Sequence, residues 1–156
     1  MNVSEIMTKK VASCRPEATL ATVAGLMWSE NIGSVVAVDS QGVPVGIVTD
    51  RDIAMASFLN HRSLWDLTVQ NIISGHTLRT CRPEDSAESA VEAMRAYEIR
   101  RLPVVDGKGR LLGILSLGDL VSAAEPGMGR KKPDLPLHAL EPALRAVFAH
   151  HALTTA

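Results

Sequence analysis

Two short segments of the chain combine a hydroxyl group with a carboxylate three residues later. The first contains Thr49 and Asp52, the second Ser116 and Asp119, and both fit the pattern G-h-x-[S/T]-x-x-D. At a strand end, this spacing places both side chains at a helix N-terminus, where free N–H groups and the helix dipole favour an anion. The combination suits a ribose phosphate, because the carboxylate accepts from ribose hydroxyls while the hydroxyl and backbone amides meet phosphate.

The same pattern has an explanation that needs no ligand. A hydroxyl residue followed three positions later by an acidic residue is also a capping box. Two observations favour a ligand: the glycine three residues before each hydroxyl is repeated, and basic residues stand nearby. Arg51 is beside Asp52, and Arg100-Arg101 stands just before a predicted strand. Both interpretations stay open at this point.

The two segments belong to two copies of one longer repeat. Cys14-Arg15-Pro16-Glu17 recurs as Cys81-Arg82-Pro83-Glu84, an offset of 67 residues. The same offset superimposes Met27 on Met94, and about a dozen identities stay in register over roughly forty residues. A repeat present only twice predicts two copies of one small fold about a pseudo-two-fold axis. Function is then expected between the copies.

Each copy has the pattern of a strand, a helix, a hairpin and a second helix. Apolar residues recur at helical spacing after two candidate N-caps, Thr19 and Ser86, and β-rich runs separated by Asp- and Gly-containing turns predict hairpins. The predicted strands are 11–13, 34–38 and 45–48 in the first copy, and 77–80, 102–105 and 112–115 in the second. The fold class is therefore α/β (α+β), with two β-α-β-β-α repeats, each a three-stranded sheet with helices on one face.

These patterns predict three parts of the chain. Residues 1–66 are the first repeat with its connecting segment, 67–124 the second repeat, and 125–156 a C-terminal extension. The connection over 54–68 is expected to pack on the core with Trp65, whereas His61 is expected at the surface.

The C-terminal extension is expected to hold a linker and a short helix. Glu125-Pro126-Gly127 predicts a helix end, and residues 129–133 predict a flexible basic linker. Pro142 suits the first position of a helix that ends near His150-His151. That helix is expected to dock on its own module, on a dimer mate or on an effector protein, with a frayed terminus as the alternative.

Composition excludes several classes of protein. Sixteen Lys and Arg residues against seventeen Asp and Glu residues give no reason to expect nucleic acid or an anionic membrane as partner. There is no apolar run of about 20 residues and no signal-peptide pattern, so the cytoplasm is expected. Cys14 and Cys81 are expected to be free thiols. No metal site is expected, because His138, His150 and His151 lack a partner at ligand spacing.

The whole pattern resembles a pair of CBS domains, the repeat named after cystathionine β-synthase. The resemblance rests on the tandem copies, on the run from Ile99 to Asp106 and on the two G-h-x-[S/T]-x-x-D segments, and it covers roughly residues 2–124. It implies two clefts between the repeats that bind adenosine-containing ligands such as AMP, ADP, ATP, S-adenosylmethionine or NAD. It also implies a disc-like homodimer and a role in energy sensing.

The resemblance assigns roles to particular residues. The ribose and phosphate contacts are expected from Thr49, Asp50, Arg51, Asp52, Arg100, Arg101, Ser116 and Asp119. The adenine slot is expected from Val35, Val36, Leu102 and Pro103. The copies differ, since Gly33-Ser34 stands where the second copy has Arg100-Arg101, and Asp50-Arg51 stands where it has Leu117-Gly118. The two clefts are therefore expected to differ in affinity.

Three functional hypotheses follow from these patterns. The first is a regulatory module that binds an adenine nucleotide and transmits this to a partner or dimer mate. The second is a ligand-free dimerisation scaffold in which the same motifs serve only as helix caps. An enzyme is not expected, because the sequence shows no nucleophile with a base, no paired carboxylates and no metal set. No cofactor is required under either favoured hypothesis.

Overall fold

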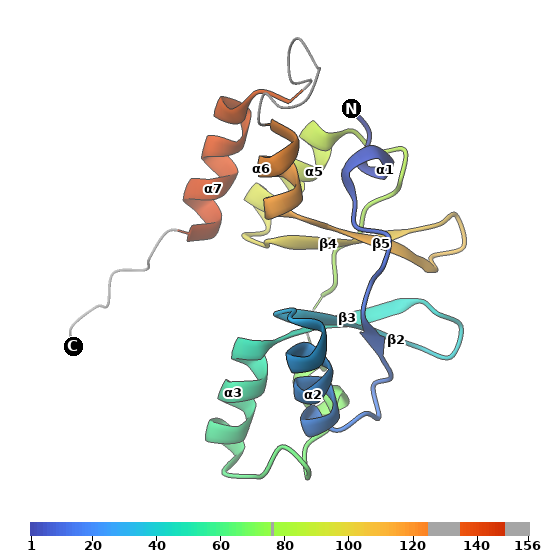
Figure 1. Cartoon of the computed structure of the whole chain (residues 1–156), viewed down its shortest axis with the longest axis vertical. Coiled ribbons are helices and arrows are strands. Elements are labelled where there is room, and N and C mark those ends of the chain that lie inside the picture. The colour runs from blue at the N-terminus through green and yellow to red at the C-terminus, as the bar shows by residue number, and fades with distance from the viewer. Residues whose placement is uncertain (76, 125–134, 149–156) are drawn as a thin grey trace, which may run out of the picture. The chain divides into compact units, whose positions relative to one another are not determined.

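The computed structural model of the protein describes residues 1–75, 77–124 and 135–148. Helices and strands are mixed along the chain, as expected of an α/β protein (Figure 1). The helices are α1 Val3–Ile6, α2 Leu20–Glu30, α3 Asp50–Asn60, α4 Val69–Ile73, α5 Ala87–Ala96, α6 Leu117–Ala124 and α7 Glu141–Phe148, with a 3-10 helix at Leu137–Leu140. The strands are β1 Ser13–Cys14, β2 Ser34–Val38, β3 Pro44–Thr49, β4 Arg101–Val105 and β5 Leu111–Ser116. None of the helices in the described ranges is long and apolar enough to cross a bilayer.

The chain forms two compact units. The first-repeat unit contains residues 9–80 together with 105–113, the turn region of the second hairpin. The second-repeat unit contains residues 1–8, 81–104 and the described residues from 114 onward. The first eight residues therefore fold with the second repeat and not with the copy that follows them in sequence.

The first-repeat unit contains a three-stranded sheet in the order β1-β2-β3. Strand β1 pairs parallel with β2, and β2 pairs antiparallel with β3, with Ser34 opposite Thr49. This confirms the predicted hairpin, which is one residue longer at each end of its second strand. The predicted first strand lies slightly later, at Ser13–Cys14, although the carbonyl of Ala12 already accepts from the Val36 N–H at 3.1 Å.

Helix α2 forms where the apolar spacing predicts it. The Thr19 hydroxyl accepts from the backbone N–H of Thr22 at 3.2 Å and caps the helix. Asn31 closes the helix with a left-handed φ of 53°. The buried face then packs with residues from β2, β3, α3 and α4 into one hydrophobic cluster, formed by Leu20, Val23, Met27, Val35, Ala37, Val48, Ile53, Ala56, Leu67, Val69 and Ile73.

The second-repeat unit has a smaller sheet than expected. Strands β4 and β5 form a two-stranded sheet, and the predicted strand at 77–80 is absent. Only Cys81 bridges to Val104, with its N–H donating to the Pro103 carbonyl at 3.0 Å. Pro103 occupies the repeat position of Val36, whose N–H donates to Ala12 in the first copy. Because proline has no N–H, the equivalent ladder bond cannot form.

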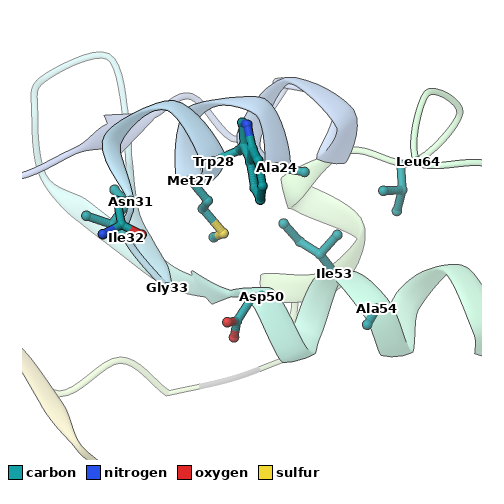
Figure 2. Close-up of a pocket in the computed structure, with 10 residues that line it drawn as sticks. All are labelled: Ala24, Met27, Trp28, Asn31, Ile32, Gly33, Asp50, Ile53, Ala54 and Leu64. Atoms are coloured by element: carbon teal, nitrogen blue, oxygen red, sulfur yellow. The ribbon is translucent and has the colours of Figure 1, made fainter.

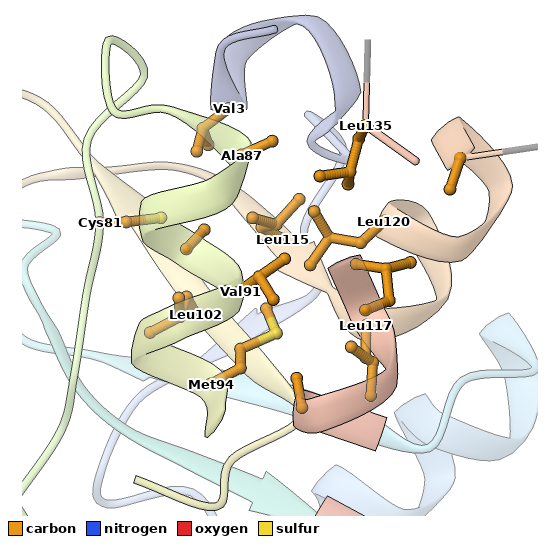
Figure 3. Close-up of a cluster of buried hydrophobic side chains, with 14 of the residues drawn as sticks. Val3, Cys81, Ala87, Val91, Met94, Leu102, Leu115, Leu117, Leu120 and Leu135 are labelled. Atoms are coloured by element: carbon orange, nitrogen blue, oxygen red, sulfur yellow. The ribbon is translucent and has the colours of Figure 1, made fainter. Parts of the chain in front are cut away.

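The core of the second-repeat unit draws on distant parts of the chain (Figure 3). Val3 from α1 and Leu135 from the C-terminal segment are both fully buried in it. Helix α1, which the sequence did not predict, is tied down by a bond from the Val3 N–H to the Asp85 carbonyl at 2.9 Å. Figure 3 shows these side chains converging with residues of α5, β4, β5 and α6, including Ala87, Val91, Met94, Leu102, Leu115, Leu117 and Leu120.

The C-terminal helix α7 packs on its own module, the first of the docking modes considered from the sequence. It contacts α5, and Leu140 and Ala143 are fully buried in the second-repeat core. The helix begins at Glu141, one residue before Pro142. The predicted helix end at Glu125-Pro126-Gly127, the linker at 129–133 and the end near residues 150–151 lie outside the described residues.

The segment after α3 differs in part from its prediction. His61 is exposed, as expected, and ends α3 with a left-handed φ of 51°. Trp65, expected on the core, is 74% exposed, and Leu67 takes the buried position instead. A short helix that was not predicted, α4, follows and packs against β3.

Aspartates hold the two hairpin turns in the same way. One carboxylate oxygen of Asp39 and one of Asp106 each accept two backbone N–H bonds at 2.8 and 2.9 Å. The donors are Gln41 and Val43 in the first turn, and Lys108 and Arg110 in the second. These bonds lower the pKa of both aspartates, since the charged carboxylate is the better acceptor.

Adding one methyl group at Gly46 should destabilise the protein. A Cβ built at Gly46 would lie 2.7 Å from Cγ2 and 2.8 Å from Cβ of the buried Ile73 side chain, which connects β3 to α4. We expect Gly46→Ala to lower the free energy of unfolding by about 1–3 kcal/mol in urea denaturation. Gly25→Ala, where no atom lies within 4 Å, is the matched control and should raise stability by up to about 1 kcal/mol. Equal stability of the two variants would contradict the close packing of α4 on β3.

Acid should weaken the hairpin turns. Because the pKa values of Asp39 and Asp106 are lowered in the folded state, their contribution is present above the unfolded-chain pKa of about 3.9. It is lost as the pH falls through the lower folded-state pKa. The variant Asp39→Asn/Asp106→Asn keeps an acceptor oxygen but does not titrate. Its urea midpoint should therefore fall less than the wild-type midpoint between pH about 5 and about 2, and parallel pH profiles would contradict this role.

Candidate functional site

The first candidate site lies where β3 ends and α3 begins. Both the N–H and the hydroxyl of Thr49 donate to Oδ2 of Asp52, at 2.8 and 2.7 Å. The Asp52 N–H donates back to the Thr49 hydroxyl oxygen at 3.2 Å. This is a complete capping box, so the ligand-free interpretation of the motif describes its geometry correctly.

The second candidate site repeats this arrangement between β5 and α6. The N–H and hydroxyl of Ser116 donate to Oδ2 of Asp119 at 2.7 and 2.6 Å, and the Asp119 N–H donates to the Ser116 hydroxyl oxygen at 3.1 Å. The two strand-to-helix junctions therefore have one geometry in both copies. We call them the first and second junction.

Each junction is joined to the start of the other strand of its hairpin. The Asp50 N–H donates to the Gly33 carbonyl at 3.3 Å, and at the equivalent position the Leu117 N–H donates to the Arg100 carbonyl at 2.9 Å. This bond brings Arg100 and Arg101 beside the N-terminus of α6. The structure thus places together the basic pair and the hydroxyl–carboxylate pair that the sequence singled out in the second copy.

The two junctions differ in charge. Arg101 is half-buried, and its side chain makes no hydrogen bond or ion pair to any residue in the described ranges. Arg100 is exposed, with its guanidinium carbon 4.9 Å from the ring centre of Phe148 on α7. At the first junction Asp50 and Arg51 are both exposed, and the Asp50 carboxylate accepts from the Arg51 N–H at 2.8 Å. The second junction is therefore the more suitable of the two for an anion.

A residue that sequence reasoning missed also lies at the second junction. Thr8 pairs with Ile114 through two backbone bonds of 2.9 Å, and its hydroxyl donates to Oδ1 of Asp119 at 3.5 Å. No local sequence pattern marks Thr8, because its partner Asp119 is 111 positions away. Both carboxylate oxygens of Asp119 thus have hydroxyl neighbours.

The four residues assigned to the adenine slot are all buried, but on two kinds of face. Val35 and Leu102 belong to the hydrophobic clusters of their units. Val36 and Pro103 follow them directly in β2 and β4, so their side chains point to the opposite faces of those strands. The adenine slot itself stays a prediction. Of its four residues, Val36 and Pro103 are the two that do not belong to these hydrophobic clusters.

The two cysteines are free thiols, Cys81 buried and Cys14 half-buried. Burial, together with the smaller effect of the nearby Asp85 charge, raises the pKa of Cys81 to about 12. Burial also raises the pKa of Cys14. Such thiols are poor nucleophiles. In the part of the chain that the structure describes, no three His, Cys, Asp or Glu residues are arranged to hold a metal ion.

Comparison with known proteins identifies the repeat. The family model for the CBS domain matches residues 3–58 and again residues 69–125. The chain belongs to the CBS-domain family. As a CBS-domain pair, it carries one strand-to-helix junction in each repeat.

Relatives and solved structures agree with this assignment. The CBS domain-containing protein YhcV of Bacillus subtilis is 37% identical over 123 residues, which cover 76% of this chain and 82% of the relative. The CBS domain protein PAE2072 of Pyrobaculum aerophilum, solved with AMP, is 28% identical with a TM-score of 0.67, covering 77% of this chain and 90% of that one. The CBS-domain pair of protein MJ0100, solved with 5′-methylthioadenosine and S-adenosyl-L-methionine, is 27% identical with a TM-score of 0.68, covering 77% and 92%.

Removing either junction hydroxyl should cost stability, because it is a helix cap. We expect Thr49→Ala and Ser116→Ala each to lower the free energy of unfolding by about 1 kcal/mol in thermal or urea denaturation. Thr49→Ser and Ser116→Thr keep the hydroxyl and serve as controls. If the alanine variants are as stable as these controls, the hydroxyls do not stabilise the helix starts.

Proposed function

We propose that the protein is a regulatory module that binds an adenosine-containing ligand and transmits its presence to a partner. AMP, ADP, ATP, S-adenosylmethionine and NAD are the candidates, and all share the ribose that the junction carboxylates would read. The support is the second junction, where a carboxylate, two hydroxyls and a half-buried arginine without a partner among the described residues come together. The proteins PAE2072 and MJ0100, which resemble this chain in fold, were solved with ligands of this class.

We assign the polar contacts as follows. Asp119 would accept from the ribose hydroxyls, since a carboxylate has lone pairs beyond those used by its cap bonds. Arg101 would pair with phosphate or carboxylate, with Arg100 at the rim. At the first junction Thr49, Asp50, Arg51 and Asp52 are the equivalent candidates. We propose that the apolar residues Val36 and Pro103 contact the adenine. The clefts between the repeats stay a prediction.

The ligand-free scaffold remains the second candidate function. Its specific support is that both capping boxes are complete without any ligand. The two candidates differ in one measurable property. A scaffold loses stability when a junction carboxylate is changed, whereas a sensor also loses ligand binding.

We further propose that the protein acts by regulation and not by catalysis, in the cytoplasm, as a homodimer. Ligand binding can shift the conformation of such a module only if the ligand binds one arrangement more tightly than the other. The regulated partner would then read that arrangement.

A thermal-shift panel tests the proposal. The ligands are AMP, ADP, ATP, S-adenosylmethionine and NAD, with a guanine nucleotide as the non-adenosine control. A bound ligand at about a hundred times its dissociation constant should add about 2.7 kcal/mol to stability, a shift of several degrees. We expect Arg101→Gln to weaken binding about tenfold or more, because a charge-assisted contact is lost.

Arg51→Gln is the matched control, since it makes the same change at the first junction. If a ligand binds both variants as tightly as it binds wild type, the second junction is excluded as its binding site. No shift with any adenosine compound would favour the scaffold. Asp119→Asn then separates the two functions, because its amide oxygen can still accept at the cap while its contact to ribose is weakened.

A further inference from the structure

Helix α7 is buried less deeply at its C-terminal end than at its start. Leu140 and Ala143 are fully buried in the second-repeat core. Leu144 and Val147 pack on the same core but are only half-buried, and Phe148 is 52% exposed. The first four of these residues follow the i, i+3, i+4, i+7 spacing of one helical face. Because few apolar contacts hold it, the last turn of α7 can change its position while the core beneath the first turn stays packed.

The exposed end of α7 contacts an arginine of the second junction. The guanidinium carbon of Arg100 lies 4.9 Å from the ring centre of Phe148, within the range of a cation–π contact. The carbonyl of Arg100 accepts from the N–H of Leu117, the first residue of α6, at 2.9 Å. The backbone of Arg100 is thus fixed at the junction, and its long side chain lies against Phe148. Arg100 therefore joins the end of α7 to the start of α6.

The contact with Phe148 leaves the hydrogen-bonding edge of the arginine free. An arginine over an aromatic ring uses the face of its planar guanidinium, whereas its N–H donors point outward in that plane. Within the described ranges, the Arg100 side chain makes no hydrogen bond or ion pair. The same is true of Arg101, the next residue. The start of α6 therefore has two guanidinium groups beside it whose donors are available to an anion.

The same place in the first repeat is open and acidic. Gly33 stands at the repeat position of Arg100, and it lines an open groove of about 550 Å³ between α2 and α3 (Figure 2). Figure 2 shows the Asp50 carboxylate near Gly33, and a Cβ built at Gly33 would lie 3.5 Å from Oδ2 of Asp50. The first copy thus has a carboxylate where the second has a guanidinium. The arginine and the aromatic ring that contacts it occur together, in the second repeat.

We propose that Phe148 is a positioning residue that holds the Arg100 guanidinium, so that Arg100 and Arg101 together bind the phosphate or carboxylate group of a ligand at the second junction. Resting on the proposed function, this assignment adds to the site a residue beyond the segments that the CBS family model matches. A free arginine side chain loses rotamer freedom when it binds an anion, whereas one already held against a ring loses less. Phe148 therefore raises the affinity for a charged ligand and leaves the affinity for an uncharged one unchanged.

The same contact makes the end of α7 sensitive to the ligand. Coupling between two binding equilibria is reciprocal, so an anion that binds more tightly when α7 is docked also stabilises the docked α7 by the same factor. The last turn is the least buried part of the helix and lies at the surface. A partner protein that contacts this turn would thereby distinguish the liganded from the free protein.

Titration calorimetry with AMP and adenosine tests the positioning role. We expect Phe148→Leu to weaken AMP binding about two- to fivefold, the size of an exposed cation–π contact. Adenosine binding should not change, because adenosine has no anionic group. Phe148→Tyr keeps the aromatic ring and should bind both compounds as wild type does. In an Arg100→Gln background, Phe148→Leu should have no further effect on AMP binding, since the two residues act through one contact.

Hydrogen exchange of α7 separates this inference from the proposed function. In the protein without ligand, Arg100→Gln should raise the exchange rate of the amides in residues 145–148 about two- to fivefold, because the last turn loses its contact with the junction. AMP should lower this rate in wild type but not in Arg100→Gln. Arg51→Gln makes the same change at the first junction and should leave the exchange of α7 as in wild type.

The two measurements distinguish four results. AMP binding that is equal in wild type and Phe148→Leu, or α7 exchange that is unchanged in Arg100→Gln, would overturn the inference and leave the proposed function standing. An equal loss of AMP and adenosine binding in Phe148→Leu would show that α7 acts by packing alone, and would overturn it too. If neither compound binds wild type, the positioning role fails together with the proposed function for these ligands.

Discussion

The reciprocal hydrogen bonds between a hydroxyl and a carboxylate at each strand-to-helix junction organise both repeats. At the end of β3 and of β5 the chain leaves a sheet and starts a helix within one residue, and the amides of the first helical turn would otherwise have no partner. The hydroxyls of Thr49 and Ser116 each accept from one of these amides, that of Asp52 or Asp119, and the first amide of each helix donates to a carbonyl at the start of the other hairpin strand. These bonds fix the residue at which α3 and α6 begin, immediately after their strands. Because the same atoms are the candidate ligand contacts, stability and recognition share one set of groups.

The two repeats have kept this junction while diverging around it. Pro103 removes the N–H that Val36 donates in the first copy, so the second sheet lacks a strand. Arg100 and Arg101 replace Gly33 and Ser34, which makes the second junction basic. The two copies of one fold thus differ in sheet size and in the charge at their junctions. The change in charge falls at the start of α6, and the loss of a strand falls at β4.

Much of this structure was predictable from local patterns, and each failure has a physical cause. Helix α2, with its cap at Thr19, and both hairpins follow from apolar spacing and turn residues close together in sequence. The junction pairs were found for the same reason. Helices α1 and α4 have four and five residues, too few to show a helical period, although the Thr68 and Asn71 box at α4 was a usable signal. The position of Thr8 depends on a partner far away in the chain, Asp119. The exposure of Trp65 depends on how the rest of the chain packs. No local pattern encodes either.

The position of the first eight residues has a consequence for how the chain folds. Val3 and Thr8 pair with residues Asp85 and Ile114, so these contacts join residues 1–8 to the second half of the chain. Such contacts raise the contact order and slow folding, because the loop between the partners must be closed first. During synthesis on the ribosome the first-repeat elements α2 to α4 emerge early and have their partners at hand, whereas the leading segment must wait. The last part of the CBS pair to assemble therefore contains residues 1–8, which are synthesised before either repeat, and the second junction is completed only then.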